Sequence, residues 1–275
     1  MVQSDLPNGS EGRGKANRSV QRALRTLRHI GSNERPLTLS TLVRELGIPK
    51  SSLLSLLRAL EEEGFVENRG VTGYVLGLRT LELGCAYGRT AGPIRVVHPA
   101  LVSLSRRLDM TAHFAIRDGQ DVVYLDKEEP PGLYIRLASE VGGRLPVHLT
   151  AVGQAILSAG FPELELEPVA WELKGTSGFP HTPKELVDVL AVVRRRGYAV
   201  DEGETLLPVR CVAAAIIDSS GQASGAIGVS YLRHGGPSAK EVGPAVKQVA
   251  AEVSRRLGHD VGGEHLSAGH GGGRG

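Results

Sequence analysis

The chain has 275 residues, of which 41% are hydrophobic, and its 32 Lys and Arg residues nearly balance its 30 Asp and Glu residues. This length is too great for one small domain, and the aliphatic content is high enough to build two cores. No apolar run reaches the roughly 18 residues that span a bilayer, and the first segment lacks the apolar centre of a signal peptide. We therefore expect a two-domain cytoplasmic protein with no membrane segment.

Composition also sets apart the two ends of the chain. Residues 1–16 are polar, and residues 258–275 consist largely of Gly, His and Ser, so we expect both segments to be disordered. Cys85 and Cys211 are far apart in the sequence, and neither has a second Cys or a His at the spacing of a zinc site. They form either two thiols or one disulfide, and a reducing compartment favours the thiols. The sequence predicts no metal site and no cofactor.

Residues 38–60 have the pattern of two short amphipathic helices joined by a tight turn. Gly47-Ile48-Pro49 supplies the turn. Apolar residues recur at helical spacing on both sides of it: Leu39, Leu42, Val43 and Leu46 before the turn, and Leu53, Leu56, Leu57 and Leu60 after it. Two helices connected so closely must cross at a steep angle. The pattern predicts a helix-turn-helix, the first indication of a DNA-binding domain.

The outer face of the second helix is small and polar. Its candidate contact residues are Lys50, Ser51, Ser52 and Ser55 in the first two turns, followed by Arg58. Such a face suits a helix whose N-terminal end enters the major groove of DNA. Serine hydroxyls can bind phosphates or any base edge, so they carry little sequence information by themselves. These residue types therefore predict DNA binding but no particular operator.

A short hairpin is expected directly after these helices. Residues 65–68 and 74–76 are strand-like, and a glycine-rich turn at residues 69–73 separates them. This hairpin is the candidate wing of a winged helix-turn-helix over residues 17–76. Arg69 in the turn either contacts a neighbouring phosphate or is solvated.

Charge gives only modest support to this interpretation. Residues 1–90 carry 13 Lys and Arg against 9 Asp and Glu, whereas the remainder carries 19 against 21. The excess has the sign expected for nucleic-acid binding, but it is small. A helical unit with a hairpin can also bind proteins, so a winged-helix scaffold with a protein partner stays open as an alternative.

The order of these motifs resembles the N-terminal domain of the IclR family of bacterial transcription regulators. The resemblance covers residues 19–83, with matching segments at 19–24, 46–52, 56–60, 63–65 and 73–77. It implies double-stranded operator DNA as a partner. Members of the family commonly carry an arginine where this chain has Ser55, so a charged contact is either missing here or moved to Arg58.

Residues 77–92 are predicted to form a helix that links two domains. The segment has no proline, and it carries Leu78, Leu81 and Leu83. Exposed leucines on a linking helix often pair with a second copy, and the family resemblance implies a homodimer or a dimer of dimers. A two-fold dimer would present two recognition helices about 34 Å apart, or a multiple of that distance, to a roughly palindromic operator.

Residues 93–257 are predicted to form an α+β domain in which helices flank an antiparallel sheet. Strand patterns occur at residues 112–116, 122–125, 134–137, 198–201, 210–217 and 223–231. Asp118-Gly119 between the first two is a strong hairpin signal. Thr182 and Ser238 each begin a capping-box sequence ahead of a helical pattern. The family resemblance implies a GAF-like sensor fold that binds a small-molecule effector.

The segment 142–155 is the densest signal in this second half. Thr150 is expected to cap a helix over residues 151–158, which leaves the amides of Ala151, Val152 and Gly153 free. Free amides at a helix start attract an anion, so we hypothesise that they bind a carboxylate or another electron-rich group of a ligand. An ordinary capped helix without a ligand explains the same pattern.

The family resemblance extends to this segment and to residues 197–231, which are similar to the effector-binding blocks of IclR-type regulators. In members that sense small carboxylates, the pocket is lined by the positions held here by Ala151, Val152, Asp201, Cys211, Gly228 and Ser230. Gly228 stands where some members have a serine, which removes one hydroxyl donor. We therefore expect a roomier and less polar pocket, and a carboxylate or aromatic metabolite as the effector.

A hydrolase fused to an interaction module is the main alternative. His148, Asp201 and Cys211 could act as base, orienting acid and thiol nucleophile. Against this, Cys211 begins an apolar run, where a small buried thiol is usually inert. A constitutive DNA-binding protein whose second domain only oligomerises is a further alternative. The preferred interpretation is a transcription regulator, repressor or activator, whose operator affinity responds to an effector, and not an enzyme.

Overall fold

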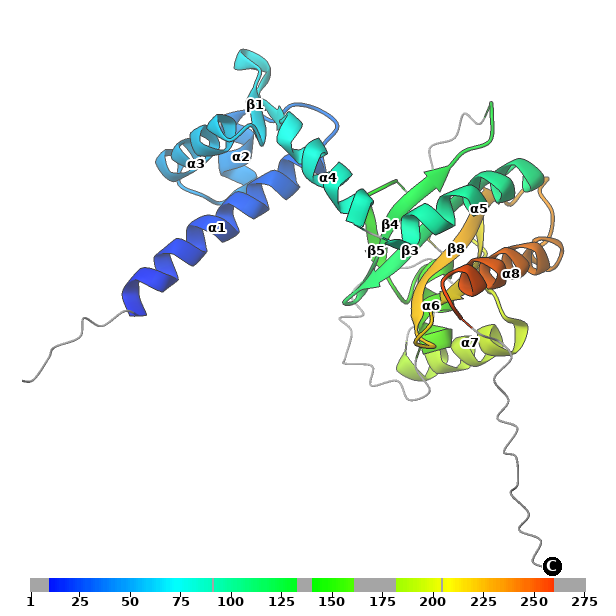
Figure 1. Ribbon diagram of the computed structural model, residues 1–275. Coiled ribbons are helices and arrows are strands. Elements are labelled where there is room, and N and C mark those ends of the chain that lie inside the picture. Colours follow the sequence, from blue (N-terminus) through cyan, green and yellow to red (C-terminus); the bar gives the residue numbers. More distant parts are fainter. Residues whose placement is uncertain (1–9, 91, 133–139, 161–181, 204, 260–275) are drawn as a thin grey trace, which may run out of the picture. The chain divides into compact units, whose positions relative to one another are not determined.

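The computed structural model describes residues 10–90, 92–132, 140–160, 182–203 and 205–259 (Figure 1). The expected strand at residues 134–137 lies outside these ranges, as do residues 1–9 and 260–275 of the two ends expected to be disordered. The chain divides into two compact units, Met1–Thr90 and Ala91–Gly275, each with its own core. No described helix combines the length and the apolar character needed to cross a membrane.

The N-terminal unit contains the predicted helix-turn-helix and hairpin. Its elements are α1 (Ser10–Gly31), α2 (Leu39–Leu46), α3 (Lys50–Glu62), β1 (Val66–Asn68), the 3₁₀ turn η1 (Gly70–Thr72), β2 (Tyr74–Leu76) and α4 (Leu78–Thr90). Helix α1 includes residues 10–16, which we predicted to be disordered. No proline interrupts this stretch, and Glu11, Arg13 and Lys15 are good helix formers, so the polar residues extend the helix.

The residues at the helix ends set the crossing of α2 and α3. The hydroxyl of Thr38 caps α2 by accepting a hydrogen bond from the Thr41 amide at 3.2 Å. Gly47 ends α2 in the left-handed conformation, with a φ of 64°, and its amide donates to the Val43 carbonyl. Pro49 then precedes α3. These ends join the apolar stripes of both helices into one core, made of Ile30, Leu42, Leu46, Ile48, Leu53, Leu57, Val66 and Tyr74.

A glycine holds the hairpin to the rest of the N-terminal unit. Strands β1 and β2 are antiparallel, and Leu37 extends the pairing through backbone hydrogen bonds of 2.8 and 3.0 Å with Tyr74. At Gly73 φ is 114°, and a Cβ atom would lie 2.5 Å from the carbonyl group of Leu37. Only glycine allows the two backbones to approach this closely. The base of the hairpin therefore has a fixed position on the helix-turn-helix.

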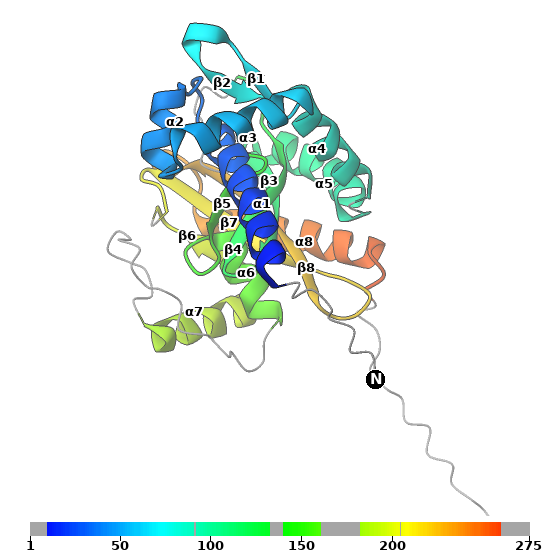
Figure 2. The ribbon, with the colours of Figure 1, turned by 90° about the vertical axis from the view of Figure 1, so that its left-hand side faces the viewer.

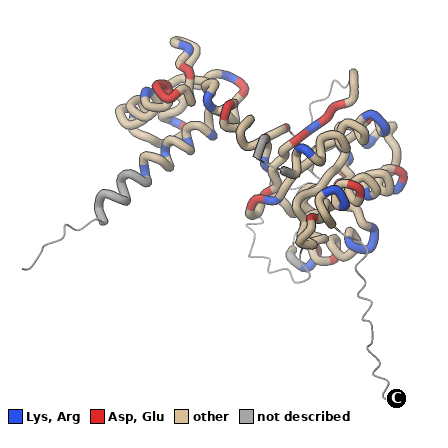
Figure 3. The backbone as a smooth tube through the Cα atoms, in the orientation of Figure 1, with Lys and Arg blue, Asp and Glu red and all other residues tan. Residues whose placement is uncertain are grey.

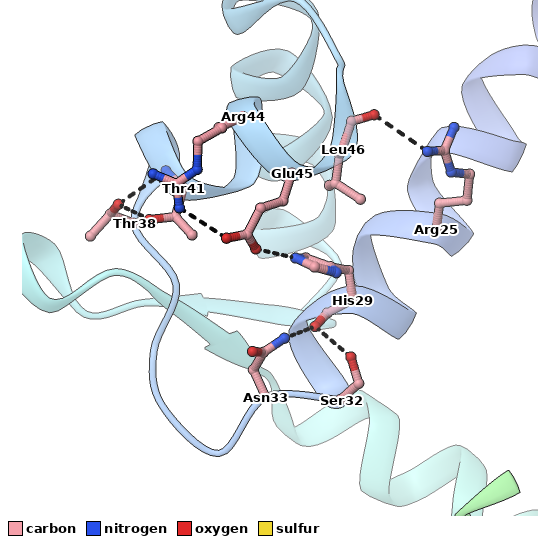
Figure 4. Close-up of polar contacts among 9 residues, drawn as sticks. All are labelled: Arg25, His29, Ser32, Asn33, Thr38, Thr41, Arg44, Glu45 and Leu46. Carbon is pink, nitrogen blue, oxygen red and sulfur yellow. Dashed lines mark hydrogen bonds and ion pairs between the residues drawn. The ribbon is translucent and has the colours of Figure 1, made fainter. Parts of the chain in front are cut away.

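Polar contacts join α1 to α2 (Figure 4). Arg25 of α1 donates to the Leu46 carbonyl at the end of α2, over 3.3 Å. Nε2 of His29 lies 2.8 Å from a carboxylate oxygen of Glu45, which also pairs with Arg44 at 2.9 Å. The hydrogen bonds from Arg44 and His29 lower the pKa of the Glu45 carboxyl below its ordinary value. Helix α1 is thereby tied to α2 through polar contacts as well as through the shared core.

The described part of the C-terminal unit contains a six-stranded antiparallel sheet in the order β5-β4-β3-β8-β7-β6. Its strands are β3 (Thr111–Asp118), β4 (Asp121–Glu128), β5 (Arg144–Pro146), β6 (Ala199–Asp201), β7 (Val209–Ile217) and β8 (Ala223–Leu232). Its helices are α5 (Gly92–Leu108), α6 (Ala151–Gly160), α7 (Pro183–Arg196) and α8 (Ala239–Arg256). The predicted α+β class is confirmed, and the hairpin expected at Asp118-Gly119 joins β3 to β4.

Helices cover both faces of this sheet, α5 and α8 on one and α6 and α7 on the other (Figures 1 and 2). Side chains of a strand alternate between the two faces. In β3, Ala112 and Phe114 belong to the core under α5 and α8, whereas Ala115 belongs to the core under α6 and α7. Burial on both faces explains why β7 and β8 are nearly continuous apolar runs. Position 113 therefore faces α6.

Candidate DNA-binding surface and ligand cavity

Helix α3 presents a polar face to solvent. Its buried side chains are Leu53 and Leu57. The predicted contact residues Lys50, Ser51, Ser52, Ser55 and Arg58 are all exposed. Within the described residues, no side chain caps the N-terminus of α3, and the partial positive charge of a helix N-terminus favours a phosphate. The exposed face is therefore chemically able to contact a nucleic-acid backbone.

The charge on α3 changes sign along the helix. Lys50 and Arg58 precede its last turn, whereas Glu61 and Glu62 end it and Glu63 follows. In the coloured part of α1, by contrast, basic residues recur along the helix (Figure 3). Carboxylates repel phosphates, so only the earlier part of α3 suits contact with DNA.

An open groove of about 630 Å³ runs between α1 and α3. Its lining consists of Ser19, Val20, Arg22 and Ala23 from α1 and Ser51, Ser52, Ser55, Leu56, Ala59 and Leu60 from α3. Arg22 therefore lines the same groove as the serine-bearing face of α3. The sequence alone did not suggest this residue, because only the packing of α1 brings it near Ser55.

Arg69 in the hairpin turn is paired with an acid of the same hairpin. Its Nε lies 3.0 Å from Oε1 of Glu67, and both side chains are about half exposed. The charge of Arg69 is thus partly neutralised. An exposed ion pair of this kind contributes little free energy, so a phosphate can compete for the guanidinium.

A small cavity lies in the C-terminal unit beside the N-terminus of α6. Its free volume is about 30 Å³, room for roughly one to three water molecules. It is lined by His113, Tyr124, Leu145, Thr150, Ala151, Val152, Asp201, Thr205, Leu206, Val209, Cys211 and Ser230. Five of the seven predicted ligand residues are among these, whereas Gly153 and Gly228 are not. The cavity thus brings together positions from α6, β6, β7 and β8 that the sequence placed in one pocket.

The N-terminus of α6 leaves two amides available, not three. The hydroxyl of Thr150 accepts a hydrogen bond from the Gly153 amide at 3.0 Å, so our expectation that this amide is free is wrong. A Cβ at Gly153 would lie 1.8 Å from the Val147 carbonyl oxygen, so this glycine serves close backbone packing. Among the described residues, the amides of Ala151 and Val152 have no hydrogen-bond acceptor, and both residues line the cavity. A ligand anion can be held by these two groups.

The expectation of a roomier and less polar pocket at Gly228 is also wrong. A Cβ at this position would lie 2.8 Å from Nε2 of His113 and 3.0 Å from Cβ of Ala213. His113 and Gly228 are paired residues of the neighbouring strands β3 and β8. The space that a serine side chain would use is therefore occupied by an imidazole, which is polar itself.

The polar side chains of the cavity are close to one another. Sγ of Cys211 lies 3.0 Å from Oγ of Ser230 across β7 and β8. Asp201 is only 2% exposed, and its Oδ1 accepts hydrogen bonds from the amides of Gly203 and Thr205 at 2.9 and 3.4 Å. These bonds hold the carboxylate at the cavity wall. A ligand in the cavity therefore meets two small donors and, next to Cys211 on β6, a fixed acid.

His113 and Tyr124 are cavity residues that the sequence analysis missed. Their rings pack edge to face with centroids 5.4 Å apart. Burial, and then the charge of Lys127, lowers the pKa of His113 to about 3. Burial also raises the pKa of the Tyr124 hydroxyl, with smaller contributions from Cys211 and Asp201. A histidine inside an otherwise apolar strand was the available signal, but its partner across the sheet was not visible in the sequence.

The lining of the cavity includes only two of the three residues of the proposed hydrolase site. Asp201 and Cys211 both line the cavity, but His148 is not among its lining residues. The histidine present there is His113, and it has the lowered pKa given above. Within the described ranges, no group of three or more His, Cys, Asp or Glu side chains is arranged to hold a metal ion.

Family models of known proteins match both units of the chain. Residues 19–70 match the model described as the IclR helix-turn-helix domain, and residues 87–255 match the model described as Bacterial transcriptional regulator IclR C-terminal. The chain belongs to the IclR family. This IclR-family protein is a transcription regulator with an N-terminal DNA-binding domain and a C-terminal effector-binding domain.

Relatives of this regulator are similar over most of their length. The transcriptional repressor IclR of Escherichia coli K12 is 30% identical over 251 residues, which cover 87% of this chain and 90% of that protein. The crystal structure of Thermotoga maritima IclR is 28% identical, with a TM-score of 0.72, over 88% of this chain and 100% of that one. An IclR homolog of Microbacterium hydrocarbonoxydans, solved in complex with 4-hydroxybenzoate, shares the fold at 21% identity, with a TM-score of 0.74 over 87% and 98% of the two chains.

Proposed function

We propose that this regulator binds operator DNA through α3 and the hairpin, and that a small carboxylate bound in the C-terminal cavity changes its affinity for that DNA. The observation that carries the proposal is the cavity, an enclosed space where five expected ligand positions meet at a helix N-terminus. Two backbone amides, a thiol and a hydroxyl converge there. This is the donor set that a carboxylate requires.

The proposed DNA contacts are Lys50, Ser51, Ser52, Ser55, Arg58 and Arg69, all of which are exposed. Family members commonly have an arginine at the position of Ser55. We propose that Arg22 supplies the corresponding positive charge, because it lines the same groove as Ser55. Arg58 carries a second charge on the outer face of α3. Phosphate contacts fix the position of the protein on the duplex, whereas the serines contribute little to choice of sequence.

The proposed ligand contacts are the amides of Ala151 and Val152 and the side chains of Cys211 and Ser230. Asp201 is buried and acidic and lies opposite Cys211 across β6 and β7, so we propose that the amides of α6 are the main contacts of the anionic end of the ligand. The free volume of about 30 Å³ favours a compact carboxylate. An aromatic acid, such as the 4-hydroxybenzoate of the Microbacterium complex, requires lining side chains to move on binding.

Assembly is proposed to run through α4. Residues 17–76 form the DNA-binding domain, residues 77–92 the linking helix and residues 93–257 the effector domain. Leu78, Leu81 and Leu83 of α4 are 70%, 61% and 60% exposed. Covering them with a second copy removes apolar surface from water and gives a homodimer or a dimer of dimers. A regulator that binds operator DNA acts where the bacterial chromosome lies, in the cytoplasm.

Regulation follows from thermodynamic linkage. If the ligand binds more tightly to one of two arrangements of the dimer, it shifts the population toward that arrangement. The affinity for DNA then changes by the same coupling free energy, typically about 1–3 kcal/mol. Both repression and activation are compatible with this linkage. No catalytic step is needed, so we propose that the protein is not an enzyme.

The proposal is tested by selecting duplexes from a random library with the full-length protein and titrating the best duplex at several salt concentrations. We expect a palindromic sequence, a linear fall of log affinity with log salt, and about a 5- to 150-fold change of affinity with at least one compound of a small-carboxylate panel. Failure to select any duplex would contradict the proposed DNA binding. An operator affinity that no carboxylate changes would contradict the proposed regulation by an effector.

A further inference from the structure

His113 lies in the cavity with unused hydrogen-bonding capacity. The side chain is 2% exposed, and its Nδ1 is buried with no hydrogen-bond partner among the described residues. The ring lines the cavity and touches the edge of Tyr124. A buried polar atom without a partner is costly, so such atoms are usually satisfied by water or a ligand. The ring therefore favours any occupant that offers it a hydrogen bond.

The backbone opposite His113 leaves room for the ring. Gly228 is its partner across β3 and β8, and a Cβ there would lie 2.8 Å from Nε2. Ala213 and the Val212 carbonyl close the same space from β7, at 3.0 and 3.1 Å from that Cβ position. A side chain at position 228 would therefore displace the imidazole. The glycine and the histidine form a matched pair in this chain.

The charges around the ring decide which ligand group suits it. Asp201 from β6, Cys211 from β7, Ser230 from β8 and Tyr124 from β4 line the same cavity. Lys127, the other neighbour of His113 across β4, is paired with Glu129 at 2.6 Å. Burial keeps the imidazole neutral near pH 7, so it cannot balance an anion. A neutral imidazole offers one donor and one acceptor, which suits a hydroxyl or a carbonyl.

We propose that His113 is a specificity-determining residue of the effector cavity, which selects carboxylates that carry an uncharged hydroxyl or carbonyl group and binds that group through the imidazole. The inference rests on the proposed function, because it requires the carboxylate to occupy the cavity. The amides of Ala151 and Val152 bind the anionic end, and His113 recognises the second polar group. A dicarboxylate is disfavoured, because its second charge faces Asp201 and a neutral ring.

Calorimetric titration of the full-length protein tests this selectivity with matched probes. Each pair differs by one hydroxyl: lactate against propionate, and 4-hydroxybenzoate against benzoate, with malonate as the dicarboxylate. We expect the hydroxylated member of at least one pair to bind about tenfold more tightly than its partner. Malonate is expected to bind more weakly than that member. If both members of each pair bind with equal affinity, the proposed role of His113 is wrong, whereas the proposed effector function is not contradicted.

Variants of the pair separate recognition from folding. His113→Leu is expected to abolish the preference for the hydroxyl, measured as the ratio of the two affinities within a pair, and His113→Asn is expected to restore part of that preference. Gly228→Ser alone is expected to weaken ligand binding. Combined with His113→Asn it is expected to be tolerated, because the asparagine side chain is smaller than the imidazole and leaves room for the serine. Circular dichroism checks that each variant is folded.

The remaining outcomes are also decisive. A preference for the hydroxyl that survives in both His113 variants overturns the inference. If none of the five probes binds the parent protein, the inference is overturned and so is the proposed class of effector. If Ser230→Ala leaves binding unchanged and binding still depends on His113, the ligand lies elsewhere in the cavity. This result contradicts the proposed carboxylate site but not the role of His113.

Discussion

The thiol of Cys211 and the hydroxyl of Ser230 lie 3.0 Å apart on directly opposed positions of β7 and β8. Both side chains line the cavity. Either group can donate to the other, and both can turn toward an anion that enters the cavity. The two groups therefore provide donors to a carboxylate without leaving a buried donor unsatisfied in its absence.

Ser230→Ala is expected to weaken carboxylate binding about tenfold, because one donor to the anion is lost. The measurement is the ligand-dependent rise in melting temperature of the full-length protein. Ser224→Ala is the matched control, since Ser224 lies in the same strand but outside the cavity lining and donates to the Ile216 carbonyl. Equal losses in the two variants would argue against the proposed site.

Arg22→Gln and Arg58→Gln are each expected to weaken DNA binding and to reduce the slope of log affinity against log salt by about 1.8 for a dimer. The reason is the loss of one phosphate contact in each of the two subunits. Arg79→Gln is the control, because Arg79 lies on α4 and is paired with Glu82 at 2.6 Å. Fluorescence anisotropy with a selected duplex gives the slopes. An unchanged slope for Arg22→Gln means that this residue does not replace the arginine absent at Ser55.

Two glycines of the hairpin are expected to differ sharply on substitution by alanine. Gly70 has a φ of +63° and open space around its Cβ position, so Gly70→Ala is expected to cost only about 1–2 kcal/mol for the left-handed conformation. Gly73→Ala adds a collision at 2.5 Å with the Leu37 backbone, so its cost is expected to be larger. Urea denaturation of both variants measures the difference. Equal costs would mean that the hairpin base is not held against Leu37.

Alkylation is expected to distinguish the two cysteines. Cys85 is exposed on α4, whereas Cys211 is half-buried beside Ser230. We expect iodoacetamide to label Cys85 first and a bound carboxylate to slow the labelling of Cys211 further. Peptide mass spectrometry over a time course provides both rates. Rapid labelling of Cys211, together with turnover of ester or amide substrates, would revive the hydrolase alternative.

Stability is expected to fall below about pH 6.5 in a way that depends on His113. Its pKa is about 3 in the folded chain against an ordinary value of 6.5, so the unfolded state binds more protons between these values. The stability linked to this residue is complete above pH 6.5 and is lost as the pH falls, by up to about 1.4 kcal/mol per pH unit.

Urea denaturation of the parent and of His113→Leu at pH 7 and pH 5.5 measures this effect. Burial also lowers the pKa of His148, which contributes with the same sign, so the difference between the two proteins isolates His113. We expect the parent to lose about 1 kcal/mol more than the variant. Parallel losses would show that His113 is not held neutral by the fold.

Local patterns in the sequence were sufficient to predict the helix-turn-helix, the hairpin and the antiparallel sheet. The turn at Gly47 and the Asp118-Gly119 hairpin are short-range signals whose backbone requirement is visible in a few residues. The prediction of disorder was wrong for residues 10–16, because polar residues can continue a helix as readily as they form a tail.

The errors at the candidate site arose from long-range packing. The Thr150 cap was predicted, but the sequence could not show that its bond to the Gly153 amide removes that amide from a ligand. Likewise, the loss of a serine at Gly228 looked like added space, because the register that sets His113 opposite it depends on the whole sheet. The effect of a substitution at one strand position cannot be interpreted without knowing which residue lies opposite it on the neighbouring strand.

The alternation of side chains across β3 and β8 has an evolutionary consequence. Ala112 and Phe114 pack under α5 and α8, whereas His113 between them faces the cavity. Val229 likewise belongs to the core under α5 and α8, while Ser230 beside it lines the cavity. Exchanges at every second position of these strands can therefore alter which metabolite is detected while the hydrophobic layer behind them stays intact. A sheet built in this way lets a lineage acquire new chemical sensing without first losing its foldability.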